Sequence, residues 1–319
     1  SHASILAPFL LGALLALALY PVYAPAGVSF TVFALFVGVS MSVPAFPVLA
    51  RFLTDRKIQS TALGTTAIAC AAVDDASAWC LLAFVSSVAS ARPGLAGWTV
   101  ALLLAYVTVM ALLVKPVLGR LMSRAAAAGD PLSPTSLALL SGMLLASAAA
   151  TEAIGIHALF GAFAFGTVVP RHRLLLEQVR ARLESVVVVL LLPAFFAYTG
   201  MRTQLGLLGS GADWVFCAVI ILVATLGKFG GSVIAARCTG MGWRESSALG
   251  ILMNTRGLME LIVLNVGLDM GILSPVLFSM LVFMALVTTF LTTPVLSLVW
   301  RGFGGTEARF RGPAYAESG

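Results

Sequence analysis

Charged residues are scarce in this sequence. Aspartate, glutamate, lysine and arginine make up 10% of its 319 residues, whereas hydrophobic residues make up 60%. Because soluble domains normally contain about 25% charged residues, this composition excludes a soluble protein and predicts an all-α polytopic membrane protein. The net charge of +6 does not indicate a nucleic-acid partner, because the basic residues lie in the short loops between apolar stretches.

Cysteine is also rare, and several common sequence features are missing. The four cysteines lie within or at the ends of apolar stretches, without the paired spacing of a metal site: Cys70, Cys80, Cys217 and Cys238. We therefore expect free thiols in the membrane, with no disulfide, no metal site and no cofactor. The sequence shows no signal peptide, linker or low-complexity run, which predicts one membrane domain at residues 1–301 and a short polar tail at 302–319.

Apolar stretches long enough to cross a hydrocarbon core of about 30 Å recur along the whole chain. We expect ten transmembrane helices, near residues 4–20, 28–53, 58–88, 95–119, 134–151, 154–170, 183–200, 212–237, 245–267 and 273–300. Short segments rich in glycine and proline separate these stretches.

The basic residues alternate between the two sides of the expected membrane domain. Of the 19 lysines and arginines, 15 belong to one side, Arg92 and Arg202 belong to the other, and Lys228 and Arg256 lie inside apolar stretches. The positive-inside rule places the richer side and the C-terminus in the cytoplasm. The residues on that side are Arg51, Arg56, Lys57, Lys115, Arg120, Arg124, Arg171, Arg173, Arg180, Arg182, Arg237, Arg244, Arg301, Arg309 and Arg311.

Two adjacent carboxylates, Asp74 and Asp75, lie in the middle of the third expected helix. A charged group at mid-bilayer depth costs roughly 2.5–3.5 kcal/mol on insertion scales, so packing alone does not account for two of them. Consecutive helical residues point about 100° apart, so both face a cavity only if it extends partly around the helix. The alternative interpretation is that neither aspartate binds an ion: one carboxylate would form a structural ion pair, and the other would lie at a polar interface.

The second expected helix is interrupted by Pro44 and Pro47. These prolines remove the N–H donors that would reach the carbonyls of Ser40 and Val43. Freed backbone at this depth is tolerated only inside protein or beside a water-filled cavity. Ser42 also lies in this interrupted segment. An interrupted helix beside a pair of carboxylates predicts an ion-binding site.

Three further charged residues lie inside apolar stretches. The buried ammonium of Lys228 needs a partner, and the carboxylate pair is the candidate; the alternative is a lysine that reaches the membrane interface. Arg256 and Glu260 are four residues apart and meet on one helical face. Together with Asn254 and Thr255, these two residues indicate a second interrupted helix. The alternative is that Arg256 and Glu260 form only a structural ion pair.

The two interrupted helices are the second and the ninth of the ten expected. Each is the middle member of a triplet, and the triplets begin on opposite sides of the membrane. This arrangement predicts an inverted repeat with two interrupted helices that cross at the midplane. Glu152 and His157, near the external end of a helical hairpin, are interpreted as loop groups without a direct role.

Several motifs, in order along the chain, resemble one group of membrane proteins: SVPAFPVLARFL, LGTTAIACAAVDDASAWCLLAF, IGIHALFGAFAFGTVVPR, LLPAFFAYTGMRT and NTRGLMELIVLNVG. Over about residues 5–300 the sequence is similar to the monovalent cation:proton antiporter families, nearest to the bacterial KefB-like transporters and the plant cation/proton exchangers. The resemblance implies the sodium/proton antiporter fold of the NhaA type, with a core domain carrying two crossed, interrupted helices and a panel domain that forms a homodimer. It implies a core at residues 1–90 and 212–301 and panel or linker helices at 95–200. Members of these families normally have about three further spans before this region, and many have a cytosolic domain after the last span.

The resemblance also implies roles for individual residues. Asp75 is similar by position to the aspartate that takes the cation or the proton, and Asp74 to its neighbour. Lys228 is similar to the lysine that forms a salt bridge with that neighbour. Residues 43–47 correspond to the first unwound helix, and residues 254–260 to the second.

The implied activity is transport and not catalysis: a monovalent cation, Na⁺ or K⁺, is exchanged for H⁺ by alternating access across a lipid bilayer such as the bacterial plasma membrane. One carboxylate site that binds either ion but never both would couple the two fluxes. A gated K⁺ efflux channel, a sodium-coupled organic-anion symporter and a non-transporting homologue are the alternatives, because a fold does not fix a function. Flux saturation and proton coupling distinguish an antiporter from a channel, and substrate accumulation identifies a symporter.

Overall fold

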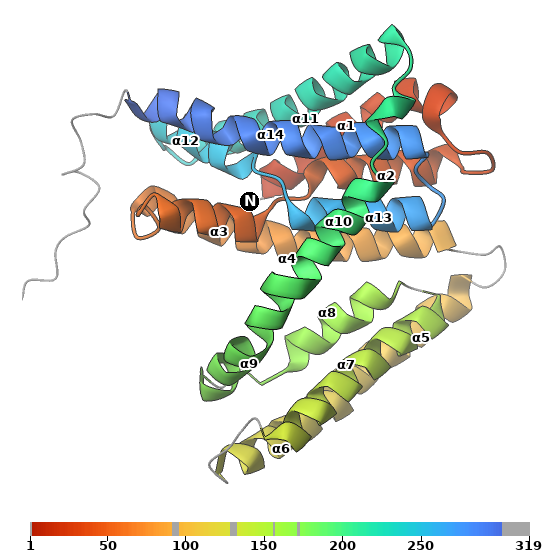
Figure 1. Ribbon diagram of the computed structural model, residues 1–319, viewed down its shortest axis with the longest axis vertical. Coiled ribbons are helices and arrows are strands. Elements are labelled where there is room, and N and C mark those ends of the chain that lie inside the picture. Colours follow the sequence, from red (N-terminus) through yellow and green to blue (C-terminus); the bar gives the residue numbers. More distant parts are fainter. Residues whose placement is uncertain (1, 91–95, 128–132, 156, 171–172, 302–319) are drawn as a thin grey trace, which may run out of the picture. The chain divides into compact units, whose positions relative to one another are not determined.

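The computed structural model describes residues 2–90, 96–127, 133–155, 157–170 and 173–301. Within these ranges every element of regular structure is a helix, which confirms the predicted all-α fold (Figure 1). The chain divides into two compact units: unit 1 comprises Ser1–Leu82 and Met201–Gly319, and unit 2 comprises Ala83–Gly200. The predicted core and panel domains remain a prediction, and the predicted tail at 302–319 lies outside the described residues.

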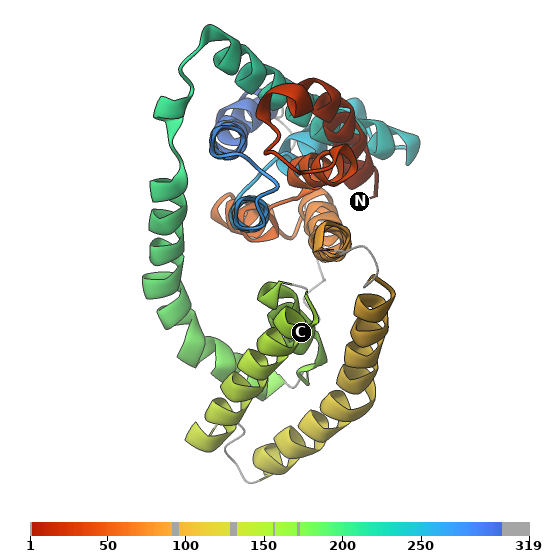
Figure 2. The same cartoon turned by 90° about the vertical axis from the view of Figure 1, so that its right-hand side faces the viewer.

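Unit 1 is built from the helices at the two ends of the chain. They are α1 (His2–Tyr23), α2 (Phe30–Ser42), α3 (Phe46–Asp55), most of α4 (Ala62–Ser90), α11 (Gly211–Cys238), α12 (Trp243–Met253), α13 (Leu258–Asp269) and α14 (Pro275–Arg301). Helix α1 packs closely against α2 and α11. Figure 2 shows α13 and α14 nearly end-on.

Glycines allow α1 and α11 to approach backbone to backbone. A Cβ atom on Gly227 would lie 2.7 Å from the Cα of Pro8, and one on Gly231 would lie 2.6 Å from the Ala3 carbonyl oxygen. Small residues drive helix association in membranes because they permit close van der Waals contact. These two positions therefore fix the contact between the first helices of the two predicted triplets.

Both predicted interruptions are present. Helix α2 ends at Ser42 and α3 begins at Phe46, with Pro44 between them and Pro47 in the first turn of α3, where a missing N–H is tolerated. Helices α12 and α13 are separated by residues 254–257 and bend by 45°. We call these segments, residues 43–45 and 254–257, the first break and the second break.

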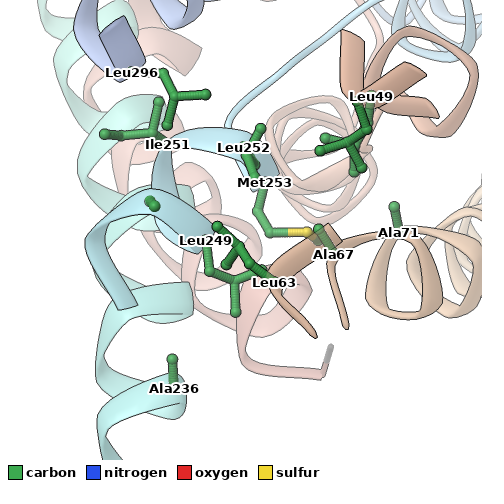
Figure 3. Packing of buried hydrophobic residues seen from close by; sticks show 12 residues of the cluster. Leu49, Leu63, Ala67, Ala71, Ala236, Leu249, Ile251, Leu252, Met253 and Leu296 are labelled. Carbon is green, nitrogen blue, oxygen red and sulfur yellow. The ribbon is translucent and has the colours of Figure 1, made fainter. Parts of the chain in front are cut away.

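The two breaks lie in direct contact. A Cβ atom on Gly257 would lie 2.7 Å from Val48 Cγ2 and 3.3 Å from Ala45 Cβ, so the second break packs against the start of α3. A cluster of buried apolar side chains joins α3, α4, α11, α12 and α14 (Figure 3). The labelled members are Leu49, Leu63, Ala67, Ala71, Ala236, Leu249, Ile251, Leu252, Met253 and Leu296.

The number of spans differs slightly from the predicted ten. Among the described residues, eight helical segments are long and apolar enough to cross a membrane, and the bent pair α12–α13 makes a ninth. The difference lies at the expected helix 154–170, where α8 (Ala158–Val168) has 11 residues. At 1.5 Å per residue it is about 16 Å long, roughly half of the hydrocarbon thickness.

Unit 2 contains the helices from the middle of the chain. They are α5 (Ala96–Val109), α6 (Lys115–Ala127), α7 (Pro134–Ile154), α8, α9 (Arg173–Val186) and most of α10 (Leu192–Arg202), with π-helical turns at Met110–Val114 and Val187–Leu191. Glu152 Oε2 accepts a hydrogen bond from the Ala158 backbone N–H (2.7 Å), and His157 is the N-cap residue of α8. Both therefore stabilise the start of α8, in keeping with the interpretation as loop groups.

Candidate functional site

Asp74 is a fully buried carboxylate on α4. Its Oδ2 accepts a hydrogen bond from the Ser4 hydroxyl of α1, whereas its Oδ1 is buried without a hydrogen-bond partner. An unpaired oxygen in a medium of low polarity is unfavourable. Asp74 is therefore bonded to α1 through one oxygen and has a second oxygen without a hydrogen bond.

Asp75 is the next residue on α4 and is only partly buried. Its Oδ1 atom is itself buried and also has no hydrogen-bond partner. Unlike Asp74, Asp75 forms no hydrogen bond to another helix among the described residues. A proton or a cation on this carboxylate would satisfy the unpaired oxygen without breaking an existing contact.

The C-terminal end of α2 is covered by two buried cations. Arg256 donates to the carbonyls of Ser40 (3.4 Å) and Met41 (2.8 Å), and Lys228 donates to the carbonyl of Ser42. These carbonyls lack helical partners because α2 stops at the first break, and a helix C-terminus carries partial negative charge. The predicted freeing of the Ser40 carbonyl thus has a structural counterpart in its bond to Arg256.

Lys228 does not form the predicted direct ion pair with Asp74. The ammonium bonds to the Ser42 carbonyl, and the ion pairs of the described residues include none between Lys228 and Asp74, although their charges interact at longer range. The carbonyl end of α2, which lacks helical partners, is the acceptor that the ammonium reaches. The alternative of an interfacial lysine is wrong, because Lys228 is fully buried.

Arg256 and Glu260 form the ion pair that their spacing predicts. Arg256 Nη1 lies 3.0 Å from Glu260 Oε1, and both side chains are fully buried. Thr289 of α14 satisfies the backbone of the second break: its hydroxyl accepts from the Arg256 N–H (3.0 Å) and donates to the Arg256 carbonyl (2.7 Å). Thr255 turns its hydroxyl back to the Leu252 carbonyl.

The site has an almost balanced set of buried charges. Two carboxylates, Asp74 and Glu260, face two cations, Lys228 and Arg256, and all four side chains are fully buried. When all four are ionised their charges cancel. Asp75 is a further carboxylate on α4, and a monovalent cation or a proton would neutralise it.

Sequence reasoning missed two residues of this arrangement, Ser4 and Thr289. Both are hydroxyl-bearing residues in apolar helices, and such residues usually bond to their own helix, so neither gives a distinctive signal. Among the described residues no group of three or more His, Cys, Asp or Glu side chains could hold a metal ion, and the four cysteines are unpaired.

Residues 1–302 match the model of a protein family described as sodium/hydrogen exchanger, transmembrane. The chain belongs to the sodium/hydrogen exchanger family. This confirms the predicted resemblance and identifies the chain as an integral membrane protein of a transporter family and not an enzyme. The described helices carry the apolar spans that such a protein needs.

Curated relatives of this exchanger family member come from bacteria, plants and yeast. It is 41% identical to the Na(+)/H(+) antiporter NhaS4 of Synechocystis over 94% of its own length and 73% of that protein. It is 37% identical to the Cation/H(+) antiporter 19 of Arabidopsis thaliana and 36% identical to the K(+)/H(+) antiporter 1 of Saccharomyces cerevisiae, over 86% and 92% of its own length. It spans 34% of each of these two larger relatives.

Proposed function

We propose that this sodium/hydrogen exchanger family member exchanges a monovalent cation for a proton, with Asp75 as the carboxylate that holds either one. The observation that carries the proposal is the buried, unpaired Oδ1 of Asp75, on the residue that follows the fully buried carboxylate of Asp74 on α4. The names of the relatives, which include a Na(+)/H(+) and a K(+)/H(+) antiporter, support the same reaction class. The cation of this proposal is Na⁺ or K⁺.

Competition at one carboxylate couples the two ions. Ionised Asp75 attracts a cation, and protonated Asp75 has no charge to offer, so each arrival displaces the other ion. Asp74 contributes its unpaired Oδ1 and stays fixed by Ser4. An empty, ionised site would leave an unbalanced charge at membrane depth, which is costly, so the loaded forms are the ones suited to cross between the two sides.

The breaks provide the moving part of the proposed cycle. Lys228 and Arg256 connect α11 and the second break to the end of α2, and Gly257 packs against α3. These contacts make α2–α3, α11 and α12–α13 suited to move together as alternating access requires. We place the side rich in Lys and Arg in the cytoplasm, and we propose a homodimer in a bacterial plasma membrane.

The experiment is cation-driven dissipation of a pH gradient in proteoliposomes. Addition of Na⁺ or K⁺ should dissipate the gradient with wild-type protein, with saturation in the cation. Asp75→Asn should abolish exchange while leaving the fold intact, because the amide holds neither ion. The matched control is Asp55→Asn, at an exposed aspartate of α3 paired with Arg51, which should exchange normally. Cation-dependent proton movement retained in Asp75→Asn would end the proposal, and cation flux without saturation or proton coupling would indicate a channel.

A further inference from the structure

One end of unit 1 carries positive charge that the candidate site does not use. Two stretches meet there: residues 51–57, at the end of α3, and residues 237–245, around the turn between α11 and α12. Together they contain five basic and two acidic residues, a net charge of +3. We call the five basic residues, all exposed or partly exposed, the basic patch: Arg51, Arg56, Lys57, Arg237 and Arg244.

The two stretches are neighbours in space although about 180 residues separate them in the chain. Ile58, which follows α3, and Met241, which precedes α12, pack against the same cluster of buried apolar side chains. In Figure 3, Leu63 of α4 lies beside Leu249 of α12. The charges of the basic patch therefore act on one region of the surface, where they repel one another unless an anion is present.

The two carboxylates of this region are already bonded locally. Asp55 pairs with Arg51 across 3.3 Å, and Glu245 Oε2 accepts a hydrogen bond from the Gly242 N–H (3.4 Å). Arg244 makes no hydrogen bond or ion pair with any described residue. It also lies in the first turn of α12, where the helix dipole disfavours a cation. Neither a partner nor the helix explains this arginine, whereas an anion from outside the chain would.

Arg237 is held in a fixed orientation on α11. Its Nη1 donates to the Met241 carbonyl, and its guanidinium carbon lies 4.6 Å from the centroid of the Trp243 ring. One face of the guanidinium is thus covered by the indole, while its other N–H groups make no bond to described residues. A planar guanidinium fixed in this way suits the oxygens of a phosphate, because little conformational freedom is lost on binding.

Exposed apolar side chains adjoin this charge. Trp243 is 68% exposed and Ile234 is 66% exposed, and Ile234 lies about 4.5 Å along the helix axis from Arg237. Tryptophan is enriched at the headgroup level of membranes. A soluble anion would not use this apolar surface, whereas a phospholipid presents a phosphate to the cations and its chains to the apolar side chains. We propose that the basic patch binds an anionic phospholipid, whose phosphate is bonded by Arg237 and Arg244.

The net charge of the patch selects the class of lipid. The headgroup of phosphatidylcholine carries its own cation, which the patch repels, whereas phosphatidylglycerol carries the phosphate charge alone. Each Lys or Arg near an anionic membrane surface strengthens the attraction about five-fold, so two arginines give a preference of about 25-fold. The binding does not rest on the proposed antiport, because none of the five basic residues belongs to the candidate site.

The test measures quenching of tryptophan fluorescence by brominated lipids in vesicles that contain the full chain. One protein keeps Trp243 as its single tryptophan, with the other four replaced by phenylalanine. The matched protein keeps only Trp214, at the opposite end of α11 beside Asp213. Competition between brominated phosphatidylglycerol and brominated phosphatidylcholine gives a relative binding constant at each position. It should favour phosphatidylglycerol about 25-fold at Trp243 and should be near one at Trp214.

Charge removal provides the second arm. Arg244→Gln should lower the preference at Trp243 about five-fold, without loss of an existing contact. Adding Arg237→Gln should bring the preference to about one. Arg120→Gln, at an exposed arginine of α6, is the matched control and should leave the preference unchanged. Equal preference at the two tryptophans, a preference that survives the double variant, or an equal loss in Arg120→Gln would each overturn the proposal.

Inorganic phosphate identifies the source of the anion. Added at the ionic strength of a chloride control, it should leave the preference at Trp243 unchanged, because it has no apolar chain. If phosphate removed the preference, the site would be one for a soluble anion and the lipid assignment would be wrong.

A measurement on the unaltered chain applies if the single-tryptophan proteins do not fold. Phosphatidylglycerol nanodiscs should raise the thermal midpoint of wild type above its value in phosphatidylcholine nanodiscs. The double variant of Arg237→Gln and Arg244→Gln should show no such difference. Equal midpoints of wild type in the two lipids, or an equal rise in the double variant, would overturn the proposal.

Discussion

Thr289 connects the second break to a neighbouring helix, and its removal is a sharp test of that structure. Its hydroxyl makes two hydrogen bonds, one to the N–H and one to the carbonyl of Arg256. The Arg256 residue is fully buried, so water does not readily replace either bond. A Thr289→Val variant keeps the shape of the side chain and leaves both backbone groups without these partners.

The expected loss follows from those two groups. A buried donor or acceptor left unpaired costs about 1–3 kcal/mol, so Thr289→Val should lower the free energy of unfolding by about 2–6 kcal/mol. Denaturant titration of the purified protein in mixed micelles measures this change. Thr289→Ser keeps the hydroxyl and should recover most of the loss.

The neighbouring threonine provides the matched control. The Thr288 hydroxyl donates to the carbonyls of Met284 (2.8 Å) and Ala285 (3.2 Å) within its own helix, and these carbonyls belong to the helical ladder. Thr288→Val should therefore cost less than about 1 kcal/mol, because no backbone group loses its main partner. Equal losses for the two valine variants would refute the role assigned to Thr289.

Three further predictions concern helix contacts and orientation. A double-mutant cycle of Lys228→Met with Asp74→Asn measures the coupling of the two residues in the free energy of unfolding. This coupling should be smaller than the roughly 3–5 kcal/mol lost when a buried pair is broken, because the ammonium bonds to the Ser42 carbonyl instead. A coupling of about 3–5 kcal/mol would show that the two side chains form a direct pair. Gly227→Ala should lower the thermal midpoint by forcing α1 from α11, whereas Gly230→Ala, with open space around it, should be neutral or stabilising by up to about 1 kcal/mol; the reverse order would contradict the close contact. With the other cysteines replaced, Cys238 should react with an impermeant maleimide from the Arg-rich side alone, and reaction only from the opposite side would invert the proposed orientation.

The sequence identified the features whose cause is local. Pro44 and Pro47 mark the first break because a missing N–H has the same effect in any fold. Arg256 and Glu260 form a pair because four residues separate them on one helix. The burial of Lys228 followed from its apolar surroundings, as the structure confirms.

The features that sequence reasoning missed depend on which helices meet. The choice of the Ser42 carbonyl by Lys228 requires the end of α2 to lie beside α11, and nothing near Lys228 in the sequence encodes that neighbour. Ser4 and Thr289 act on Asp74 and Arg256 across separations of 70 and 33 residues. The short α8 was assigned as a full span because its flanking residues are apolar as well.

The covering of α2 by cations also constrains the order in which the protein can be assembled. The carbonyls of Ser42 and Met41 are bonded by residues 186 and 215 positions later in the chain. At about 5–20 residues per second, a ribosome needs roughly 10–40 s to make the first of these partners after α2 has emerged. During that interval the broken end of α2 must remain in contact with water or with the insertion machinery, since lipid offers it no donor. The N-terminal third of the chain thus enters the bilayer before the carbonyls at the end of α2 have their donors, and the last third of the chain supplies these donors.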